Sequence, residues 1–182
     1  MHGNERRFHG GPERLRSPER LALLETARVV QLCREGHDLQ SVLDVGTGTG
    51  VFAEAFRQGS LRVTGIDPDA DLLAHARRFV PDGVFQVAVA ENLPFEEGSF
   101  DLVFLGHVLH ETDDPVRALS EARRVARARV VVLEWPFRAE DRGPPLAHRI
   151  SPERVLEAAQ AAGLTSLERI ALAHMDFYRA GV

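Results

Sequence analysis

The feature that most constrains the fold is the alternation of short apolar runs, rich in β-branched residues, with longer segments whose apolar residues recur at helical spacing. Strands that alternate with helices pair in parallel, so this order predicts a doubly wound α/β fold with helices on both faces of a mostly parallel sheet. The expected strands are Ser41–Val45, Arg62–Ile66, Val84–Val89, Phe100–Leu105, Val130–Glu134, Leu167–Leu172 and Phe177–Gly181. The last two lack an intervening helix, which predicts an antiparallel hairpin at one edge.

Helices are expected where apolar residues recur three or four positions apart behind a capping residue. The apolar sets are Leu23, Ala27 and Val30; Val116, Leu119, Ala122 and Val125; and Val155, Ala159 and Ala162. An N-cap followed by proline occurs at Ser17, Asp114 and Ser151, and Gly163 is placed to end the last helix. The stretch ARRVARAR, Ala122–Arg129, is expected on a helix with its arginines on a solvated face.

A length of 182 residues suits a single domain. We expect the ligand-binding domain to be residues 41–182, with residues 1–40 forming a helical cap or lid. The N-terminal residues lack the apolar stretch of a secretory signal, and no apolar run is long enough to span a bilayer. The chain is therefore expected to be cytoplasmic, without a membrane partner, and a monomer or homodimer.

The charged residues exclude several classes of chemistry. All 22 basic residues are arginine; without lysine there is no Schiff-base nucleophile and no P-loop lysine. The net charge of −5 gives no general attraction for nucleic acid. Cys33, the only cysteine, excludes an internal disulfide and a multi-cysteine metal site, and it is expected to be a buried packing residue, with a reactive thiol as the alternative.

A glycine-rich stretch, VLDVGTGTG, follows the first expected strand. Its glycines occupy alternate positions, Gly46, Gly48 and Gly50, whereas the dinucleotide fingerprint would need its third glycine where Val51 stands. A bend free of side chains at alternate positions can lie flat against a ligand, and the carboxylate of Asp44 suits an ammonium group. A zwitterionic amino-acid moiety fits better than a pyrophosphate, although a generic turn that binds another nucleotide stays open.

The second expected strand leads into Asp67, about twenty residues after the glycines, where an acid can accept hydrogen bonds from both hydroxyls of a ribose. Capping of the helix that follows Pro68 is the alternative role for this acid. A glycine bend, an acid for an amino group and an acid for a ribose together describe the ligand S-adenosylmethionine.

Four motifs in order, VLDVGTGTG, VTGIDPD, AENLPFEEGSFDLVF and GPPLAHRISPE, resemble those of small-molecule class I S-adenosylmethionine-dependent methyltransferases, similar to the quinone C-methyltransferase group, over roughly residues 40 to 182. The resemblance implies a seven-stranded Rossmann-like sheet with the final hairpin strand inserted beside the fifth. It also implies cofactor-binding roles for Asp44, Gly46, Thr47, Gly48, Gly50, Asp67, Pro68, Ala90, Glu91, Asn92, Gly106 and His107.

One position departs from the family pattern. The family often has Asp or Asn before the Ala-Glu pair, to accept a hydrogen bond from the adenine amino group, whereas this chain has Val89. Adenine recognition would then rest on backbone groups of Ala90 and Glu91 and on packing by Leu93. Leu105 to His107 would pass close to the sulfonium.

The expected catalytic residues are His107, His110, His148 and Arg149. Methyl transfer needs an oriented and desolvated acceptor, and a general base only where a proton must leave. In GHVLHET, His110 is the candidate base, with helix-start packing as the alternative. A metal site is not expected, because the His-x-x-His-Glu order matches neither common zinc motif.

The loop GPPLAHRISPE and the N-terminal segment carry further candidates. Arg149 is expected to clamp an anionic acceptor, or else to pair with Glu153 or with a carboxylate of the N-terminal segment. Residues 8–15, FHGGPERL, form a lid or are disordered, and Trp135 either packs in the core or lines the acceptor pocket. Two functional rivals stay open: an NAD-dependent oxidoreductase on the same fold, and a catalytically silent methyltransferase-like binding subunit.

Overall fold

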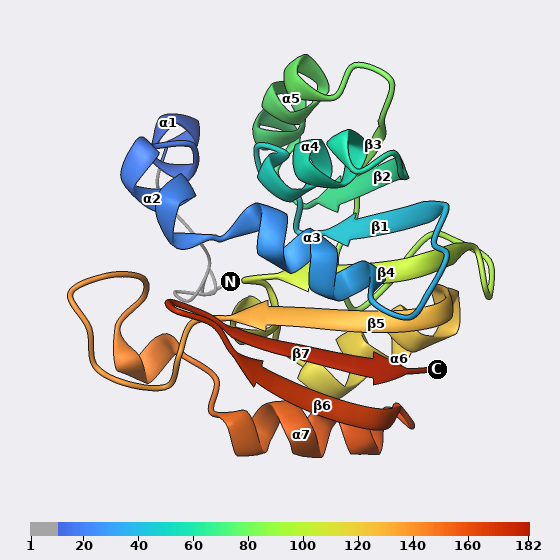
Figure 1. Ribbon diagram of the computed structural model, residues 1–182, viewed down its shortest axis with the longest axis vertical. Helices are drawn as coiled ribbons and strands as arrows, with labels where there is room; N and C mark the ends of the chain where they lie inside the picture. The colour runs from blue at the N-terminus through green and yellow to red at the C-terminus, as the bar shows by residue number, and fades with distance from the viewer. Residues whose placement is uncertain (1–10) are drawn as a thin grey trace.

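The computed structural model describes residues 11–182, and the elements named below lie in that part of the chain. A seven-stranded sheet forms the centre, in the order β3-β2-β1-β4-β5-β7-β6 (Figure 1). The strands are β1 (Ser41–Val45), β2 (Arg62–Asp67), β3 (Val84–Val87), β4 (Phe100–Gly106), β5 (Ala126–Glu134), β6 (Thr165–Ala171) and β7 (Asp176–Gly181). The first five are parallel, and β7 is antiparallel to both β5 and β6, which confirms the predicted hairpin and the insertion of the last strand beside the fifth.

Helices cover both faces of the sheet, as predicted. They are α1 (Pro12–Leu15), α2 (Pro18–Leu23), α3 (Thr26–Arg34), α4 (Val51–Gln58), α5 (Ala70–Phe79), α6 (Pro115–Val125) and α7 (Pro152–Ala161), with short 3-10 turns η1 (Leu109–Glu111) and η2 (Leu146–His148). Helices α3, α4 and α5 bury one face of the sheet, and α6 and α7 bury the other. Coverage on both faces explains why every residue of β1 is buried, including the polar Ser41 and Asp44.

The predicted helix starts are confirmed by their caps. The hydroxyl of Ser17 accepts a hydrogen bond from Arg20 N–H, that of Ser151 from Arg154 N–H, and the Asp114 carboxylate from Arg117 N–H. Each side chain satisfies a backbone donor that the first helical turn leaves open. Cys33 is fully buried under α3, in agreement with its predicted packing role, and burial raises the pKa of its thiol.

Two helix predictions were wrong. Leu23, Ala27 and Val30 do not share one helix face, because the chain breaks at Glu25, whose φ of 45° ends α2 and redirects the chain into α3. ARRVARAR is not all helical: α6 ends at Val125 and β5 begins at Ala126, four residues earlier than predicted.

The last four residues of ARRVARAR alternate as a strand does. Arg127 pairs with Asp101, and Arg129 donates to the Leu32, Cys33 and Glu35 carbonyls at the end of α3. The period of two in Arg-Ala-Arg-Val favours the strand over the helical pattern.

The parallel strands end at one edge of the molecule, where α1, α2 and the loop that carries η2 project beyond the sheet (Figure 1). Ligands of doubly wound sheets bind at this edge, where the strand order reverses between neighbours. Here β1 lies at that reversal, between β2 and β4. None of the helices in residues 11–182 is both long enough and apolar enough to cross a bilayer.

Candidate active site

A cleft of about 1520 Å³ opens at the carboxyl ends of β1, β2, β4 and β5. Its wall continues onto α1 and α2 and onto the loop that precedes α7. Almost all of the residues predicted to bind cofactor line it: Asp44, Gly46, Thr47, Gly48, Asp67, Pro68, Ala90, Glu91, Gly106 and His107. The predicted catalytic residues His107, His110 and His148 line it too, whereas Gly50, Asn92 and Arg149 do not.

The glycine bend adopts a backbone that side chains would not tolerate. Gly46, Gly48 and Gly50 have φ values of +66°, +53° and +78°. A Cβ at Gly46 would lie 2.1 Å from a methyl carbon of Val108, and one at Gly50 would lie 3.0 Å from the Ala76 side chain. Gly50 therefore serves the close packing of α4 on α5, while Gly46 and Gly48 present bare backbone to the cleft.

Asp44 lies below the bend with only 2% of its surface exposed. One of its carboxylate oxygens accepts a hydrogen bond of 2.6 Å from the Thr47 hydroxyl. Burial raises the pKa of Asp44 to about 7, against the lowering effect of that hydroxyl and of the Ala53 backbone, and the Asp67 charge raises it further. A cationic group in the cleft would restore the charged form, so this acid suits an ammonium ligand.

Asp67, at the end of β2, binds the bend to the neighbouring turn. Its two oxygens accept 2.9 Å hydrogen bonds from the backbone N–H groups of Gly48 and Asp69. Asp67 lines the cleft, and a carboxylate is an acceptor that suits a ligand hydroxyl. The cap of α5 is supplied by Asp69 and not by Asp67, so the capping alternative for Asp67 was wrong.

Ala90 and Glu91 lie at the tip of a tight turn that Val89 and Asn92 close by a backbone hydrogen bond of 3.2 Å. The Glu91 carboxylate accepts from Asp113 N–H, which ties the turn to the loop before α6. Leu93 packs in the core under α6 and does not line the cleft. Ala88, Val89, Ala90 and Glu91 line the cleft at this position and are placed to contact a ring system.

An unpartnered hydroxyl tests whether the cleft is built for a polar ligand. Among side chains of residues 11–182, Thr49 Oγ1 is a buried polar atom without a hydrogen-bond partner. Thr49 lines the cleft beside the glycine bend. A buried hydroxyl without a partner costs about 1 to 3 kcal/mol unless a ligand satisfies it. Together with the bare backbone and the two acids, it fits a ligand that carries both amino-acid and nucleoside groups.

His110 and Glu134 form a buried pair at the far side of the cleft. The ring Nδ1–H of His110 donates to Glu134 at 2.7 Å, and its backbone N–H donates to the other carboxylate oxygen at 3.2 Å. Both side chains are almost fully buried. Glu134 ends β5 and accepts from both the imidazole and the backbone N–H of His110 on η1, so helix-start packing alone does not describe His110.

His107 follows β4 in the left-handed region, with a φ of +61°. Its Nε2 lies 3.1 Å from the Met175 sulfur, and its ring lies 5.2 Å from that of Trp135 between centroids. Burial lowers the pKa of His107 well below its usual range, and the charges of Arg20 and His110 lower it further. The imidazole is neutral at physiological pH and fills the wall between the strand end and the loop. Trp135 is both buried and part of that wall.

Arg149 has a different role from the predicted anion clamp. Its guanidinium donates to the backbone carbonyls of Pro136, Arg142 and Pro144 and pairs with Glu140 at 3.2 Å. The side chain is buried beneath the loop and does not reach the cleft. The pairing alternative was right in kind, but the partner is Glu140 and not Glu153 or an N-terminal acid.

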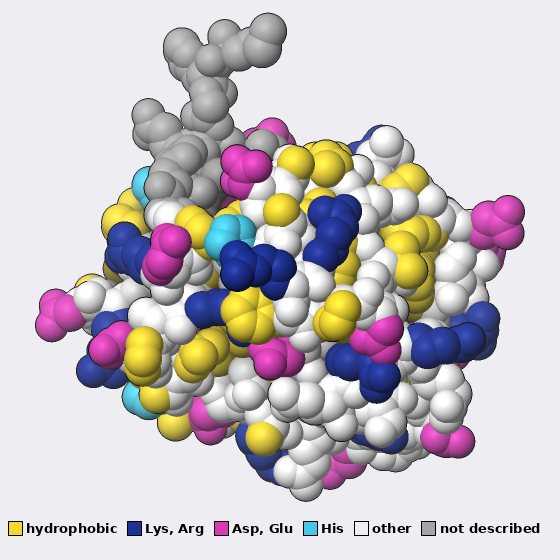
Figure 2. Space-filling view, turned by 90° about the horizontal axis from the view of Figure 1, so that it is seen from above, with side chains coloured by type: hydrophobic (Ala, Val, Ile, Leu, Met, Phe, Trp, Pro, Cys, Tyr) yellow, Lys and Arg dark blue, Asp and Glu magenta, His cyan; other side chains and the backbone are white. Residues whose placement is uncertain are grey.

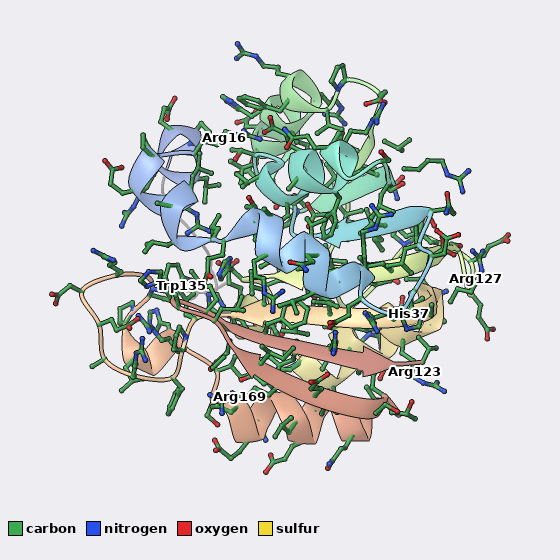
Figure 3. All side chains as sticks on the ribbon, in the orientation of Figure 1. Arg16, His37, Arg123, Arg127, Trp135 and Arg169 are labelled. Carbon is green, nitrogen blue, oxygen red and sulfur yellow. The ribbon has the colours of Figure 1, made fainter. Side chains whose placement is uncertain are left out.

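Residues of helices α1 and α2 line the cleft. Arg16 donates to the Thr49 carbonyl at 2.9 and 3.1 Å, pairs with Glu54 at 2.8 Å and stacks on Phe79 (Figure 3). The cap is thus anchored to the glycine bend and to both neighbouring helices. The aromatic residue of the predicted lid, Phe8, lies outside the described residues.

Three residues of the site were not predicted: Thr49, Glu134 and Arg20. Thr49 lies within the quoted glycine motif, and Glu134 is an acid at the carboxyl end of a predicted central strand, which is where ligands of such sheets bind. Arg20 had no distinguishing pattern among the arginines. No three His, Cys, Asp or Glu side chains of residues 11–182 converge as metal ligands would.

Comparison with known proteins gives a consistent result. A family model described as a methyltransferase domain matches residues 43–133. A demethylmenaquinone methyltransferase from Thermotoga maritima is 38% identical over 111 residues, which cover 59% of this chain and 48% of that protein. The chain therefore spans about half the length of that curated relative.

Solved structures share the fold across more of the chain. A SAM-dependent methyltransferase from Aquifex aeolicus superposes with a TM-score of 0.79 at 21% identity, covering 95% of this chain and 99% of that one. The phosphoethanolamine N-methyltransferase 2 of Haemonchus contortus, in complex with S-adenosyl-L-methionine, gives 0.73 at 16% identity, covering 86% of this chain and 52% of that one.

Proposed function

The chain belongs to the methyltransferase domain family of class I S-adenosylmethionine-dependent methyltransferases, and from this premise we propose that it transfers the cofactor's methyl group to a small molecule. The observation that carries the proposal is the meeting of a bare glycine bend with two buried acids, Asp44 and Asp67, at the carboxyl ends of β1 and β2. Family membership and site chemistry point to the same ligand independently.

Residues of this chain have distinct roles toward the cofactor. Asp44 and the glycine bend suit its amino-acid end, with Thr49 as an additional polar contact. Asp67 suits the ribose, and the turn at Ala90 and Glu91 suits the adenine through backbone groups. Gly106 and His107, at the end of β4, also line the cleft. We assign the part of the cleft lined by Trp135 and α2 to the methyl acceptor and call it the acceptor half.

When bound, the cofactor supplies an electrophilic methyl group on a sulfonium, so the protein must orient the acceptor, exclude water and hold the proton that leaves it. We assign the last task to His110. Glu134 accepts from its Nδ1–H, and we propose that Nε2, which lies 3.8 Å from a carboxylate oxygen of Glu111, receives the proton from the acceptor.

Several features support a small-molecule acceptor. The catalytic domain carries no large insertion between its strands that would bind a macromolecule. The face shown in Figure 2 has arginines interspersed with acidic and apolar side chains, not a continuous basic stripe of the kind that nucleic acid favours. The relatives named for demethylmenaquinone also act on a small molecule. A cytoplasmic monomer or homodimer without a membrane partner completes the proposal.

Titration calorimetry with S-adenosylhomocysteine tests the cofactor assignment. We expect saturable binding by the wild-type chain and at least a tenfold loss of affinity in Asp67→Ala. Asp82→Ala, at an exposed ion pair with Arg57, is the matched control and should bind as the wild type does. Unchanged affinity in Asp67→Ala would contradict the ribose role, and binding of NADH in place of S-adenosylhomocysteine would favour an oxidoreductase.

Turnover distinguishes an enzyme from a binding subunit. With an accepted substrate, His110→Ala and Glu134→Gln should both lower kcat by about 100-fold or more while the affinity for S-adenosylhomocysteine is retained. Full turnover by His110→Ala would remove this residue from catalysis. Cofactor binding without methylation of any compound in a broad metabolite screen would favour a catalytically silent subunit.

A further inference from the structure

The acceptor half of the cleft holds an arginine with no counter-ion. Arg20 projects from α2 into the cleft wall near Trp135, with its guanidinium carbon 5.9 Å from the ring centroid. Within residues 11–182 its guanidinium makes no ion pair, while twelve such pairs occupy other charged side chains of the same region. Arg20 is thus a half-buried cation that faces open space.

The surroundings of Arg20 disfavour its charged form when no ligand is bound. Burial lowers the pKa of Arg20, the nearby Arg14 charge lowers it further, and only Glu111 opposes them from a distance. Arg14 lines the same part of the cleft, and the adjoining His107 is neutral. A partly desolvated guanidinium beside a second arginine is stabilised when an anion enters.

Two aromatic rings lie beside Arg20 in the cleft wall. The Trp135 ring centroid lies 5.9 Å from the guanidinium carbon of Arg20, 5.7 Å from that of Arg149 and 5.2 Å from the His107 ring centroid. A planar organic body can rest against this wall while its charged group reaches Arg20. Arg149 donates to the loop and does not line the cleft, and among the arginines that do line it, Arg14, Arg20 and Arg142, Arg20 is the one whose guanidinium lies beside the Trp135 ring.

From this arrangement we infer that the methyl acceptor is a small organic acid whose carboxylate is bound by Arg20, with its planar body against Trp135. The planar guanidinium presents paired N–H donors that match the two oxygens of a carboxylate. The inference rests on the proposed function, because it names the substrate class of the same cleft. It places Arg20 as a specificity-determining residue on the N-terminal cap.

Paired ligands test the charge requirement. The full chain, saturated with S-adenosylhomocysteine, is titrated with a panel of aromatic carboxylic acids and with the primary amide of each acid. We expect acids that bind at least tenfold more tightly than their amides. In Arg20→Gln this preference should disappear through a loss of acid affinity, while the amides and S-adenosylhomocysteine bind as before.

Two further variants separate charge from folding. Arg20→Lys keeps the positive charge and should recover part of the acid preference. Arg28→Gln, on the exposed face of α3, is the matched control and should keep all of it. An acid preference that survives in Arg20→Gln would overturn the inference, and so would acids and amides that bind alike to the wild type. If S-adenosylhomocysteine itself fails to bind, the proposed function fails first, and this inference fails with it.

Discussion

Replacing Asp44 by Asn should shift the stability of the ligand-free protein more favourably as pH rises, with a net gain near neutral pH and above. The pKa of Asp44 is about 7 in the folded chain against an ordinary 3.8. Between these values the folded state holds a proton that the unfolded state has lost, so stability falls as pH rises through this window. The resulting loss of unfolding free energy is absent below pH 4 and complete above pH 7, where it amounts to roughly 4 kcal/mol.

The change with pH in the unfolding free energy of Asp44→Asn relative to wild type tests the reasoning more directly than its value at one pH. An amide at position 44 keeps an acceptor for the Thr47 hydroxyl but buries an N–H₂ group, which costs about 1 to 3 kcal/mol at every pH. At pH 5 the burial of Asp44 lowers the unfolding free energy of the wild type by only about 1.5 kcal/mol. The difference in unfolding free energy between Asp44→Asn and wild type should therefore rise by roughly 2.5 kcal/mol from pH 5 to pH 8.

Urea unfolding followed by circular dichroism at pH 5, 6, 7 and 8 measures this difference directly. Asp141→Asn, at an exposed position on the loop before η2, is the control and should show no such trend. The same Asp44→Asn variant should lose S-adenosylhomocysteine affinity tenfold or more, because the ammonium ligand loses its carboxylate. A stability difference that stays constant with pH would refute the conclusion that Asp44 is held neutral by burial.

Three further predictions concern the framework of the cleft. Gly46→Ala should lower the unfolding free energy by roughly 2 to 4 kcal/mol, because the new Cβ would meet Val108 in a left-handed backbone; urea titration measures it. Arg149→Met should free the loop it now binds, seen as faster tryptic cleavage at Arg142, and an unchanged cleavage rate would contradict its bracing role. Asp114→Ala should cost about 1 kcal/mol through the lost cap of α6, and a thermal midpoint equal to that of the wild type would contradict it.

The sheet was predictable because its information is local. Runs such as Val130–Leu133 are buried and form continuous apolar segments, and the caps at Ser17 and Ser151 follow from a hydroxyl beside proline. The break at Glu25 was not predictable from periodicity. It arises because Leu24 and Val29 are buried in the core while α2 turns toward the cleft, a tertiary requirement that overrides the helical pattern.

In the candidate site, too, the residues whose positions depend on local sequence were predictable, and those that depend on tertiary structure were not. Residues that lie within the bend or at strand ends, such as Asp44 and Asp67, keep the positions that their neighbours in sequence predict. Arginines depend on side-chain direction, which sequence spacing does not give. Arg149 therefore turned toward the loop that precedes it, and the anion-binding role falls to Arg20, almost 130 positions earlier in the chain.

The charges of the cleft are sorted by position, and this sorting constrains how two ligands can bind together. Asp44 and Asp67 lie at the glycine bend, whereas Arg14 and Arg20 line the wall formed by α1 and α2, which also carries Glu19. A cationic ligand and an anionic one would each lose affinity if they exchanged places, because like charges would then face each other at low dielectric. The two ligands would thus be oriented before any contact at the reacting atoms, and His110, which also lines the cleft, is the residue that we propose receives a proton from the acceptor.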